Sequence, residues 1–304
     1  MKNPVYLIII AFIAVSLTIL GILYKLASPD LISAILALII VGYTAFMFLF
    51  LKRNPKTLRI SLLGFPNSGK TVFLTVLFDQ INSRRLNGIF FSPWGRETNE
   101  KYQEDLLTIK NGAWLQCTSA DSVFPYLIKA SEKGILGRRY KIEVADYAGE
   151  YTKEFDIRSE KWLHRTEYFN YVTQSDAVFL SIDCSLLKTA KHQNKDIIEM
   201  QTMENAFIVA LQMLIEEKRV KVGKKLKTPL AIVFMKYDLI LEKPENLELY
   251  VSRLTDFCKK RCKNFQIFAV SSVGSIKKDG SPPKEIKPIG IIQPLIWTFK
   301  RLKS

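Results

Sequence analysis

Apolar residues are distributed very unevenly along the chain, and the first 52 residues differ from the rest. Two runs there, residues 5–24 and 31–51, contain no charged side chain and are apolar on every helical face. Each has the ~20 residues that a helix needs to cross a bilayer. The Ser-Pro-Asp sequence between them is typical of a helix end and restart. The pattern predicts a transmembrane helical hairpin over 1–52, with spans at about 5–25 and 31–51.

Two other interpretations of these runs fit less well. The apolar core of a cleaved signal peptide has only about 7–15 residues, and a second span would not follow it directly. A helix buried in a protein core is usually shorter, with one polar face. A hairpin that stays in the membrane is therefore the favoured interpretation.

From residue 53 onward, short strand-like runs alternate with helical segments. The predicted order is strand 58–63, helix 70–84, inserted helix 98–110, hairpin 122–145, switch helix 155–173, strand 176–182, helix 196–217, strand 229–234, helix 244–262, strand 265–270 and C-terminal helix 290–303. Such alternation predicts an α/β domain over 53–304, with a doubly wound, mostly parallel sheet. Ligands of such sheets bind at the carboxyl ends of the strands.

The composition gives the net charge of the chain and indicates its cellular compartment. The 304 residues include 44 Lys and Arg against 29 Asp and Glu, a net charge of +15, and four scattered cysteines. The 48% hydrophobic and 12% aromatic residues exclude a disordered chain, and four scattered cysteines do not make a disulfide scaffold. Basic residues follow the second run, whereas the charges of 25–30 cancel. The positive-inside rule then predicts a multi-pass protein of the inner or plasma membrane, with both termini and the domain in the cytoplasm. Its basic face is expected to meet the lipid bilayer, and nucleic acid is not an expected partner.

Residues 64–71 read Gly-Phe-Pro-Asn-Ser-Gly-Lys-Thr and stand between a predicted strand and a predicted helix. This is the G-x-x-x-x-G-K-[ST] phosphate-binding loop in the context that the motif requires. Backbone N–H groups of such a loop surround phosphates, the Lys reaches the β- and γ-phosphates, and the Thr hydroxyl binds Mg²⁺. The expected phosphate-binding residues are Gly64, Asn67, Ser68, Gly69, Lys70 and Thr71.

A second motif, Asp146-Tyr147-Ala148-Gly149, follows the strand that closes the predicted hairpin. A carboxylate at a strand end beside the phosphate-binding loop suits Mg²⁺, and the N–H of Gly149 can approach a γ-phosphate. A threonine ahead of the hairpin is expected to complete the Mg²⁺ ligands. Thr118 is the preferred candidate and Thr98 the alternative.

A third motif follows the apolar strand at 230–234 and reads Met235-Lys236-Tyr237-Asp238. In x-K-x-D, the carboxylate accepts hydrogen bonds from guanine N1 and N2, and the Lys stem packs on the base. Adenine lacks that donor pair, so Asp238 favours GTP and GDP over ATP. Met235 replaces the usual Asn or Thr. Ser271 and Ser272, after the last strand, are expected to place backbone near guanine O6.

Taken together, these motifs make residues 57–300 resemble the Ras-like, translation-factor-related class of P-loop GTPases. The loop at 64–71 is similar to that of Era/Obg-type GTPases. The segment from Trp114 to Thr118, the Asp-Tyr-Ala-Gly-Glu segment and the ending at 294–297 resemble prokaryotic double-GTPase-type domains. The anchored arrangement also resembles the β subunit of the eukaryotic signal recognition particle receptor. The resemblance places Glu150 where many members carry a water-positioning Gln, which implies slow hydrolysis or dependence on a partner.

The resulting hypothesis is a membrane-anchored protein that binds and hydrolyses GTP with Mg²⁺ and switches a protein effector or activator. The residues expected to take part in catalysis are Lys70, Thr118, Gly149 and Glu150. Two alternatives stay open. A non-catalytic GTP-binding scaffold is favoured by Glu150, and an ATP-using P-loop protein is favoured by Met235.

Overall fold

The computed structural model describes Leu31, Ser33, and residues 36–45, 55–82, 84–86, 88–116, 123–133, 137–147, 167–190, 194–240, 243–277 and 279–303. The chain divides into two compact units, one made of Met1–Pro55 with Gly134–Arg139 and the other of Lys56–Lys133 with Tyr140–Ser304. The second unit is the α/β domain, and each unit is treated by itself below.

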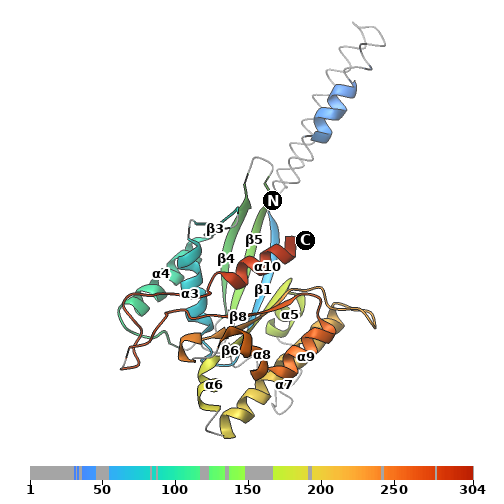
Figure 1. Cartoon of the computed structure of the whole chain (residues 1–304). Coiled ribbons are helices and arrows are strands. Elements are labelled where there is room, and N and C mark those ends of the chain that lie inside the picture. The colour runs from blue at the N-terminus through green and yellow to red at the C-terminus, as the bar shows by residue number, and fades with distance from the viewer. Residues whose placement is uncertain are drawn as a thin grey trace. The chain divides into compact units, whose positions relative to one another are not determined.

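An eight-stranded sheet with the order β2-β3-β4-β5-β1-β6-β7-β8 forms the centre of the domain (Figure 1). The strands are β1 (Lys56–Leu63), β2 (Arg84–Leu86), β3 (Ile89–Pro93), β4 (Val123–Glu132), β5 (Arg139–Tyr147), β6 (Ala177–Asp183), β7 (Leu230–Met235) and β8 (Phe265–Ala269). β5, β1, β6, β7 and β8 run parallel, and β2, β3 and β4 add an antiparallel edge. The carboxyl ends of the parallel strands therefore all lie along the same edge of the sheet, called the carboxyl edge below.

Helices cover both faces of this sheet, as its buried strands require. The helices are α3 (Lys70–Ile81), α4 (Arg96–Lys110), α5 (Glu167–Gln174), α6 (Cys184–Ala190), α7 (Asn194–Glu217), α8 (Leu247–Tyr250), α9 (Ser252–Arg261) and α10 (Gln293–Lys303), with short 3₁₀ turns at Tyr237–Leu239 and Pro244–Asn246. One core cluster joins α3, α4 and α10 to a face of the sheet, and another joins α5, α7 and α9 to the opposite face. The predicted doubly wound α/β architecture is confirmed.

The phosphate-binding loop follows β1, a largely buried strand near the middle of the sheet. All seven residues of β6 are buried, as are Ile60 through Leu63 of β1. A strand buried on both faces reads as a continuous apolar run. β1 lies between β5 and β6 near the middle of the sheet, so the loop that follows it opens at the centre of the carboxyl edge.

Several predicted elements match closely and others need correction. The inserted helix expected at 98–110 is α4, Arg96–Lys110. The helix expected over 244–262 is broken at Val251 into α8 and α9, with φ −130° and ψ 43° at the break. β2, β3 and α6 were not predicted. Of the switch helix expected at 155–173, the structure describes only the part from Glu167.

The predicted hairpin of the first 52 residues lies largely outside the described residues. The first span falls wholly outside them, whereas in the second the structure describes residues 36–45 as helical. Among the residues that can be examined, no helix is long and apolar enough to cross a membrane.

Candidate functional site

The loop at 64–71 connects β1 to α3 and has the backbone of a phosphate cradle. Asn67 and Gly69 both have positive φ, 62° and 89°, and Gly69 directly precedes the first residue of α3. No side chain caps this helix, and its first N–H groups point back toward the loop, as they do at any helix start. A helix start of this kind binds anions through backbone N–H groups and the helix dipole.

Lys70 is the first residue of α3 and lines the pocket. Its side chain is buried, and its Nζ donates hydrogen bonds to the carbonyl oxygens of Gly64 at 2.8 Å and Phe65 at 3.0 Å. These bonds offset part of the penalty of burying an ammonium group. They also hold a positive charge beside the loop, where phosphate oxygens would bring negative charge.

The start of the loop packs tightly against the neighbouring strand β6. A Cβ atom added to Gly64 would lie 1.7 Å from Ser181 Oγ, so only glycine fits there. The hydroxyl of Ser181 also lies 3.1 Å from the hydroxyl of Ser68, in a buried contact. Gly64 is thus a packing residue of the cradle, whereas residues 66–72 line the pocket itself.

The segment after β7 is tied to the phosphate loop by Lys236. Its Nζ donates to the carbonyl oxygen of Asn67 at 2.6 Å and to Asp183 Oδ2, also at 2.6 Å. Lys236 has a left-handed backbone, with φ 56°, which turns the chain sharply at the strand end. The base-side and phosphate-side motifs therefore meet, as their order along the chain predicts.

Asp183 is a functional candidate that the sequence reasoning missed. It ends β6, and its Oδ1 accepts hydrogen bonds from Ser185 N at 2.8 Å and Ser185 Oγ at 2.7 Å, while its other oxygen pairs with Lys236. The signal that could have found it is an acidic residue at the end of a wholly buried, mostly apolar strand. With Met235 buried at the end of β7, this ion pair provides a polar tie that an Asn or Thr there would otherwise make.

Asp238 is held in place by Ser271. The Ser271 hydroxyl donates to Asp238 Oδ1 at 2.5 Å and accepts from the backbone N–H of Gly274 at 3.0 Å. Ser271 is buried, whereas Ser272 lines the pocket together with Asp238. The two serines expected at the base thus have different positions: Ser271 orients the carboxylate, and Ser272 faces the ligand space.

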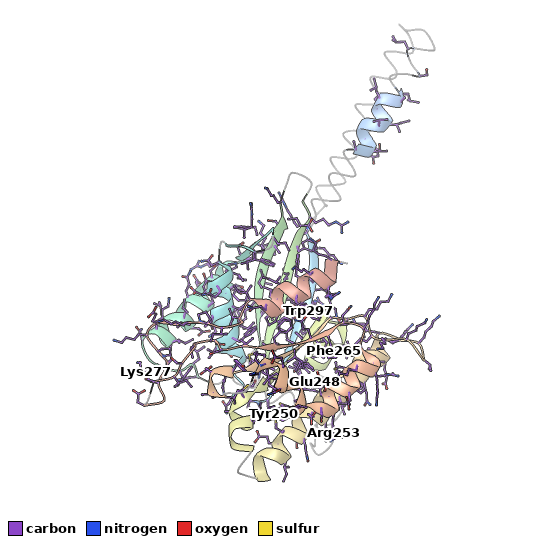
Figure 2. All side chains as sticks on the ribbon, viewed as in Figure 1. Glu248, Tyr250, Arg253, Phe265, Lys277 and Trp297 are labelled. Carbon is purple, nitrogen blue, oxygen red and sulfur yellow. The ribbon has the colours of Figure 1, made fainter. Side chains whose placement is uncertain are left out.

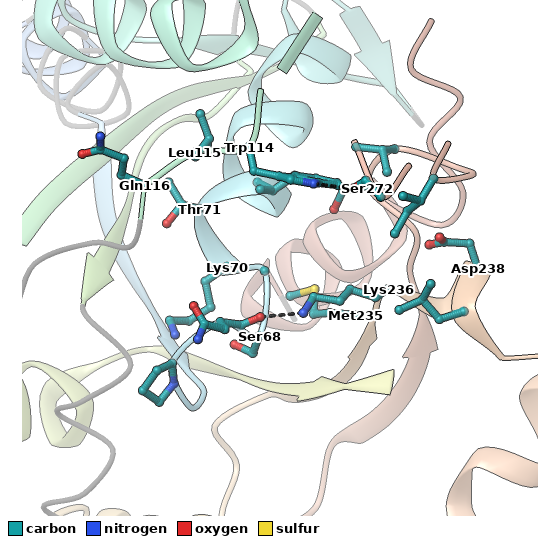
Figure 3. Close-up of a pocket in the computed structure, with 18 residues that line it drawn as sticks. Ser68, Lys70, Thr71, Trp114, Leu115, Gln116, Met235, Lys236, Asp238 and Ser272 are labelled. Carbon is teal, nitrogen blue, oxygen red and sulfur yellow. Dashed lines mark hydrogen bonds between the residues drawn. The ribbon is translucent and has the colours of Figure 1, made fainter. Parts of the chain in front are cut away.

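One cavity of about 520 Å³ brings these motifs together (Figure 3). Its lining includes Lys70, Thr71, Lys236, Asp238 and Ser272. This volume lies within the range of about 300–1,000 Å³ typical of small-ligand pockets. A ligand with an anionic group at one end and hydrogen-bond donors at the other fits such a lining.

Trp114 closes one side of this cavity. It follows α4, and with Leu115 and Gln116 it lines the pocket across from Lys236 (Figure 3). Its indole Nε1 donates to the carbonyl oxygen of Gly280 at 2.8 Å, which joins this segment to the long loop between β8 and α10. The resemblance had singled out Trp114, but its partner, 166 positions later in the chain, could not be read from the sequence.

The metal side is described only in part. Thr71 lines the pocket, and Asp146 lies near the end of β5, which is hydrogen-bonded to β1. Mg²⁺ is usually held by one or two protein oxygens together with phosphates, and the Thr71 hydroxyl suits that role. Thr118, Gly149 and Glu150 lie outside the described residues.

Thr98, the alternative switch threonine, has a structural role. It is buried in α4, and its hydroxyl oxygen accepts a hydrogen bond from the backbone N–H of Leu127 at 3.2 Å. It is not among the residues that line the pocket. The structure therefore does not support Thr98 as a metal ligand.

A phosphate cradle after β1, a Lys-x-Asp segment after β7 and a shared pocket define a P-loop GTPase. The family model of Double-GTPase 2 matches residues 58–290. The chain belongs to this family, and its domain binds guanine nucleotides, as the family and the pocket imply.

Solved structures give a weaker likeness. The Arl6 BBS3 small GTPase of Trypanosoma brucei, bound to the nucleotide analogue GppNp, is 16% identical with a TM-score of 0.44, covering 82% of this chain and 98% of its own. The nucleolar GTP-binding protein 1 of Plasmodium falciparum is 14% identical with a TM-score of 0.39, covering 82% and 88%. No curated protein matches the chain significantly.

Replacing Trp114 by phenylalanine tests the closure of the pocket. Phenylalanine keeps an aromatic ring but removes the N–H donor to Gly280, and one such hydrogen bond contributes about 0.5–1.5 kcal/mol. We expect GDP to dissociate about two- to tenfold faster, measured by displacing a fluorescent GDP with unlabelled GDP. Trp94, an exposed tryptophan outside the pocket, provides the control when changed to phenylalanine in the same way. Equal dissociation rates for both variants would mean that the bond does not retain the nucleotide.

Proposed function

We propose that this protein hydrolyses GTP to GDP and uses the two nucleotide states to control a partner at a membrane. The observation that carries the proposal is the convergence of Lys70 and Asp238 on one pocket, although 168 positions separate them in the sequence. The first residue suits a phosphate chain and the second suits guanine. A guanine nucleotide would use both ends of such a pocket.

In phosphoryl transfer, the main contribution of the protein is to place positive charge and hydrogen-bond donors beside the phosphates. Phosphoryl transfer develops negative charge on the phosphate oxygens, which the Lys70 ammonium and the N–H groups at the start of α3 would stabilise. Mg²⁺, when bound through Thr71 and Asp146, would supply further positive charge. Thr118 and the Gly149–Glu150 segment are proposed as the parts that respond to the γ-phosphate.

Membrane anchoring is the second part of the proposal. Support comes from the uncharged runs of the first 52 residues. In the described helical part of the second run, the side chains of Leu38, Ile40 and Val41 are more than half exposed. Exposed apolar side chains in such a row need an apolar environment. We propose two spans in the inner or plasma membrane, with both termini and the GTPase domain in the cytoplasm.

Glu150 favours a second candidate, a scaffold that binds GTP without hydrolysing it. A carboxylate at that position would orient an attacking water differently from the Gln found in many GTPases. A single experiment separates the candidates: titration of the full chain with GTP, GDP and ATP in Mg²⁺, followed by single-turnover measurement of phosphate release. Tight GTP binding with phosphate release supports the switch. Tight binding without release, even after addition of a membrane or cell extract, supports the scaffold, and preference for ATP overturns both.

A further inference from the structure

At the end of the sheet opposite the pocket, two basic segments form one surface. Residues 218–227 contain six Lys and Arg residues and residues 259–263 contain four, with no acidic residue in either segment. The first segment precedes β7 and the second ends at the start of β8. We call residues 218–227 and 259–263 the basic edge. All ten of its cationic residues are exposed.

Backbone hydrogen bonds hold the two segments together. Leu226 N donates to the carbonyl oxygen of Arg261 at 2.8 Å, and Lys263 N donates to that of Leu226, also at 2.8 Å. Lys225 Nζ reaches the carbonyl oxygen of Lys259 at 2.6 Å. Like charges are thus kept close by the fold itself, although each repels the others within about 10 Å.

Neighbouring acidic residues offset part of this repulsion: Glu216 and Glu217 directly precede the first segment, and Asp256 lies three positions before the second. Lys259 pairs with Glu248. Within the described part of the chain, no other cation of the basic edge has a carboxylate partner. Protein surfaces more often intersperse both signs of charge. A surface of one sign held by a rigid backbone suits an extended anionic partner.

The tip of the first segment carries an apolar side chain that has no packing role. Val222 is 100% exposed, and it lies in a turn closed by a hydrogen bond from Lys224 N to the carbonyl oxygen of Lys221 at 3.0 Å. Gly223 has φ +77°, which gives the turn its sharp bend. In Figure 2 this loop, between α7 and β7, extends outward at the right of the view with long side chains around it.

We infer that the basic edge docks on an anionic lipid bilayer, with Val222 entering the boundary between headgroups and acyl chains. Lysine predominates over arginine in the basic edge, and neither segment contains an aromatic, Asn or Gln residue. Lysines act as point charges toward lipid phosphates, whereas nucleic acids are recognised through Arg, aromatic and amide side chains. An apolar tip surrounded by lysines has no use on nucleic acid but suits a membrane surface.

The position of the basic edge keeps the pocket accessible. Five strands run parallel, and the pocket lies at their carboxyl ends. The loops before β7 and β8 therefore lie at the opposite end of the strands, where the strands begin. β1 also starts on that side, at Lys56, directly after the residues proposed to be anchored. The inference therefore adds a second membrane contact, and it rests on the anchoring proposed above.

A fluorophore at the tip tests this inference. The full chain with Val222→Cys in a Cys117→Ser background would carry a polarity-sensitive dye, since Cys184, Cys258 and Cys262 are buried. The control is Leu249→Cys, an exposed residue on α8 that follows the carboxyl end of β7. Both would be reconstituted in phosphatidylcholine vesicles with and without phosphatidylglycerol, and quenched with nitroxide-labelled lipid.

We expect several-fold stronger quenching at position 222 when phosphatidylglycerol is present, and no such change at position 249. The double variant Lys221→Glu, Lys224→Glu should lose the effect. Equal quenching with and without phosphatidylglycerol, or a response to added RNA in its place, would overturn the inference. Flotation with neutral vesicles tests the anchoring separately, and GTP binding by the labelled protein tests the nucleotide site.

Discussion

Replacing Lys70 by alanine is expected to abolish GTP turnover, with a loss of about 10²–10³-fold or more. The substitution removes the positive charge that Lys70 holds beside the cradle through the carbonyl oxygens of Gly64 and Phe65. Nothing else on the loop carries a full positive charge, because residues 64–69 have no cationic side chain. Phosphate release under single-turnover conditions and equilibrium binding of GTP measure the effect.

Lys110→Ala is the matched control for this variant. Lys110 is an exposed lysine at the end of α4 and is not among the residues that line the pocket. Thermal unfolding of both variants checks that they are folded, since the lost hydrogen bonds of Lys70 also contribute about 1 kcal/mol each. A folded Lys70→Ala protein that hydrolyses GTP at the normal rate would refute the assignment of the phosphate site.

The second large effect is expected from Asp238→Asn, which should change the preferred base. In the proposed complex the carboxylate would accept from two donors of guanine, and each hydrogen bond to a charged group contributes about 1.5–3 kcal/mol. We expect GTP affinity to fall by about tenfold to a hundredfold. Xanthosine triphosphate carries an oxygen in place of the guanine amino group, so the amide of the variant can donate to it. Competition between the two nucleotides for one fluorescent probe measures the switch.

Asp256→Asn serves as the control, since Asp256 is exposed on α9 and does not line the pocket. The hydrogen bond from Ser271 should persist in Asp238→Asn, because the amide oxygen can still accept it. If the variant loses affinity for GTP without gaining affinity for xanthosine triphosphate, then Asp238 supports the loop and does not bind the base. An unchanged preference for GTP would place the base elsewhere.

Sequence pattern predicted those parts of the domain that depend on local signals. The apolar run of β1 and the loop after it specify their own structure, since the glycines, the lysine and the helix start are consecutive in the chain. α4 was predicted within two residues at its start, because its long polar stretch has a strong helical character. The doubly wound architecture, though not the order of its strands, follows from the alternation of strands and helices.

The break between α8 and α9 depends on a distant residue and could not be predicted locally. Glu204 of α7 accepts a hydrogen bond from Leu254 N at 3.1 Å, 50 positions away, and so satisfies an N–H group at the start of α9. Burial raises the pKa of Glu204, whereas this hydrogen bond opposes the shift. The edge strands β2 and β3 did have a local signal: the sequence Asn-Gly at 87–88 is typical of a hairpin turn, and Gly88 has φ +80°.

At the site, the sequence identified the chemical groups but not their supports. Asp238, Lys236 and the loop at 64–71 belong to motifs with fixed spacing. The supports come from other strands: Asp183 and Ser181 from β6, Ser271 after β8, and Gly280 from the following loop. Such partners are set by which strands are neighbours, and that order is a property of the folded sheet.

The bond between Trp114 and Gly280 has a consequence for how a regulator could act. It joins two segments that both line the pocket, so separating them would widen the pocket and favour release of a bound nucleotide. A protein that binds the segment around Gly280 and displaces it would break the hydrogen bond to Trp114 without contacting the phosphate-binding loop. Exchange of GDP for GTP could then be accelerated from the base end, leaving the phosphate end intact.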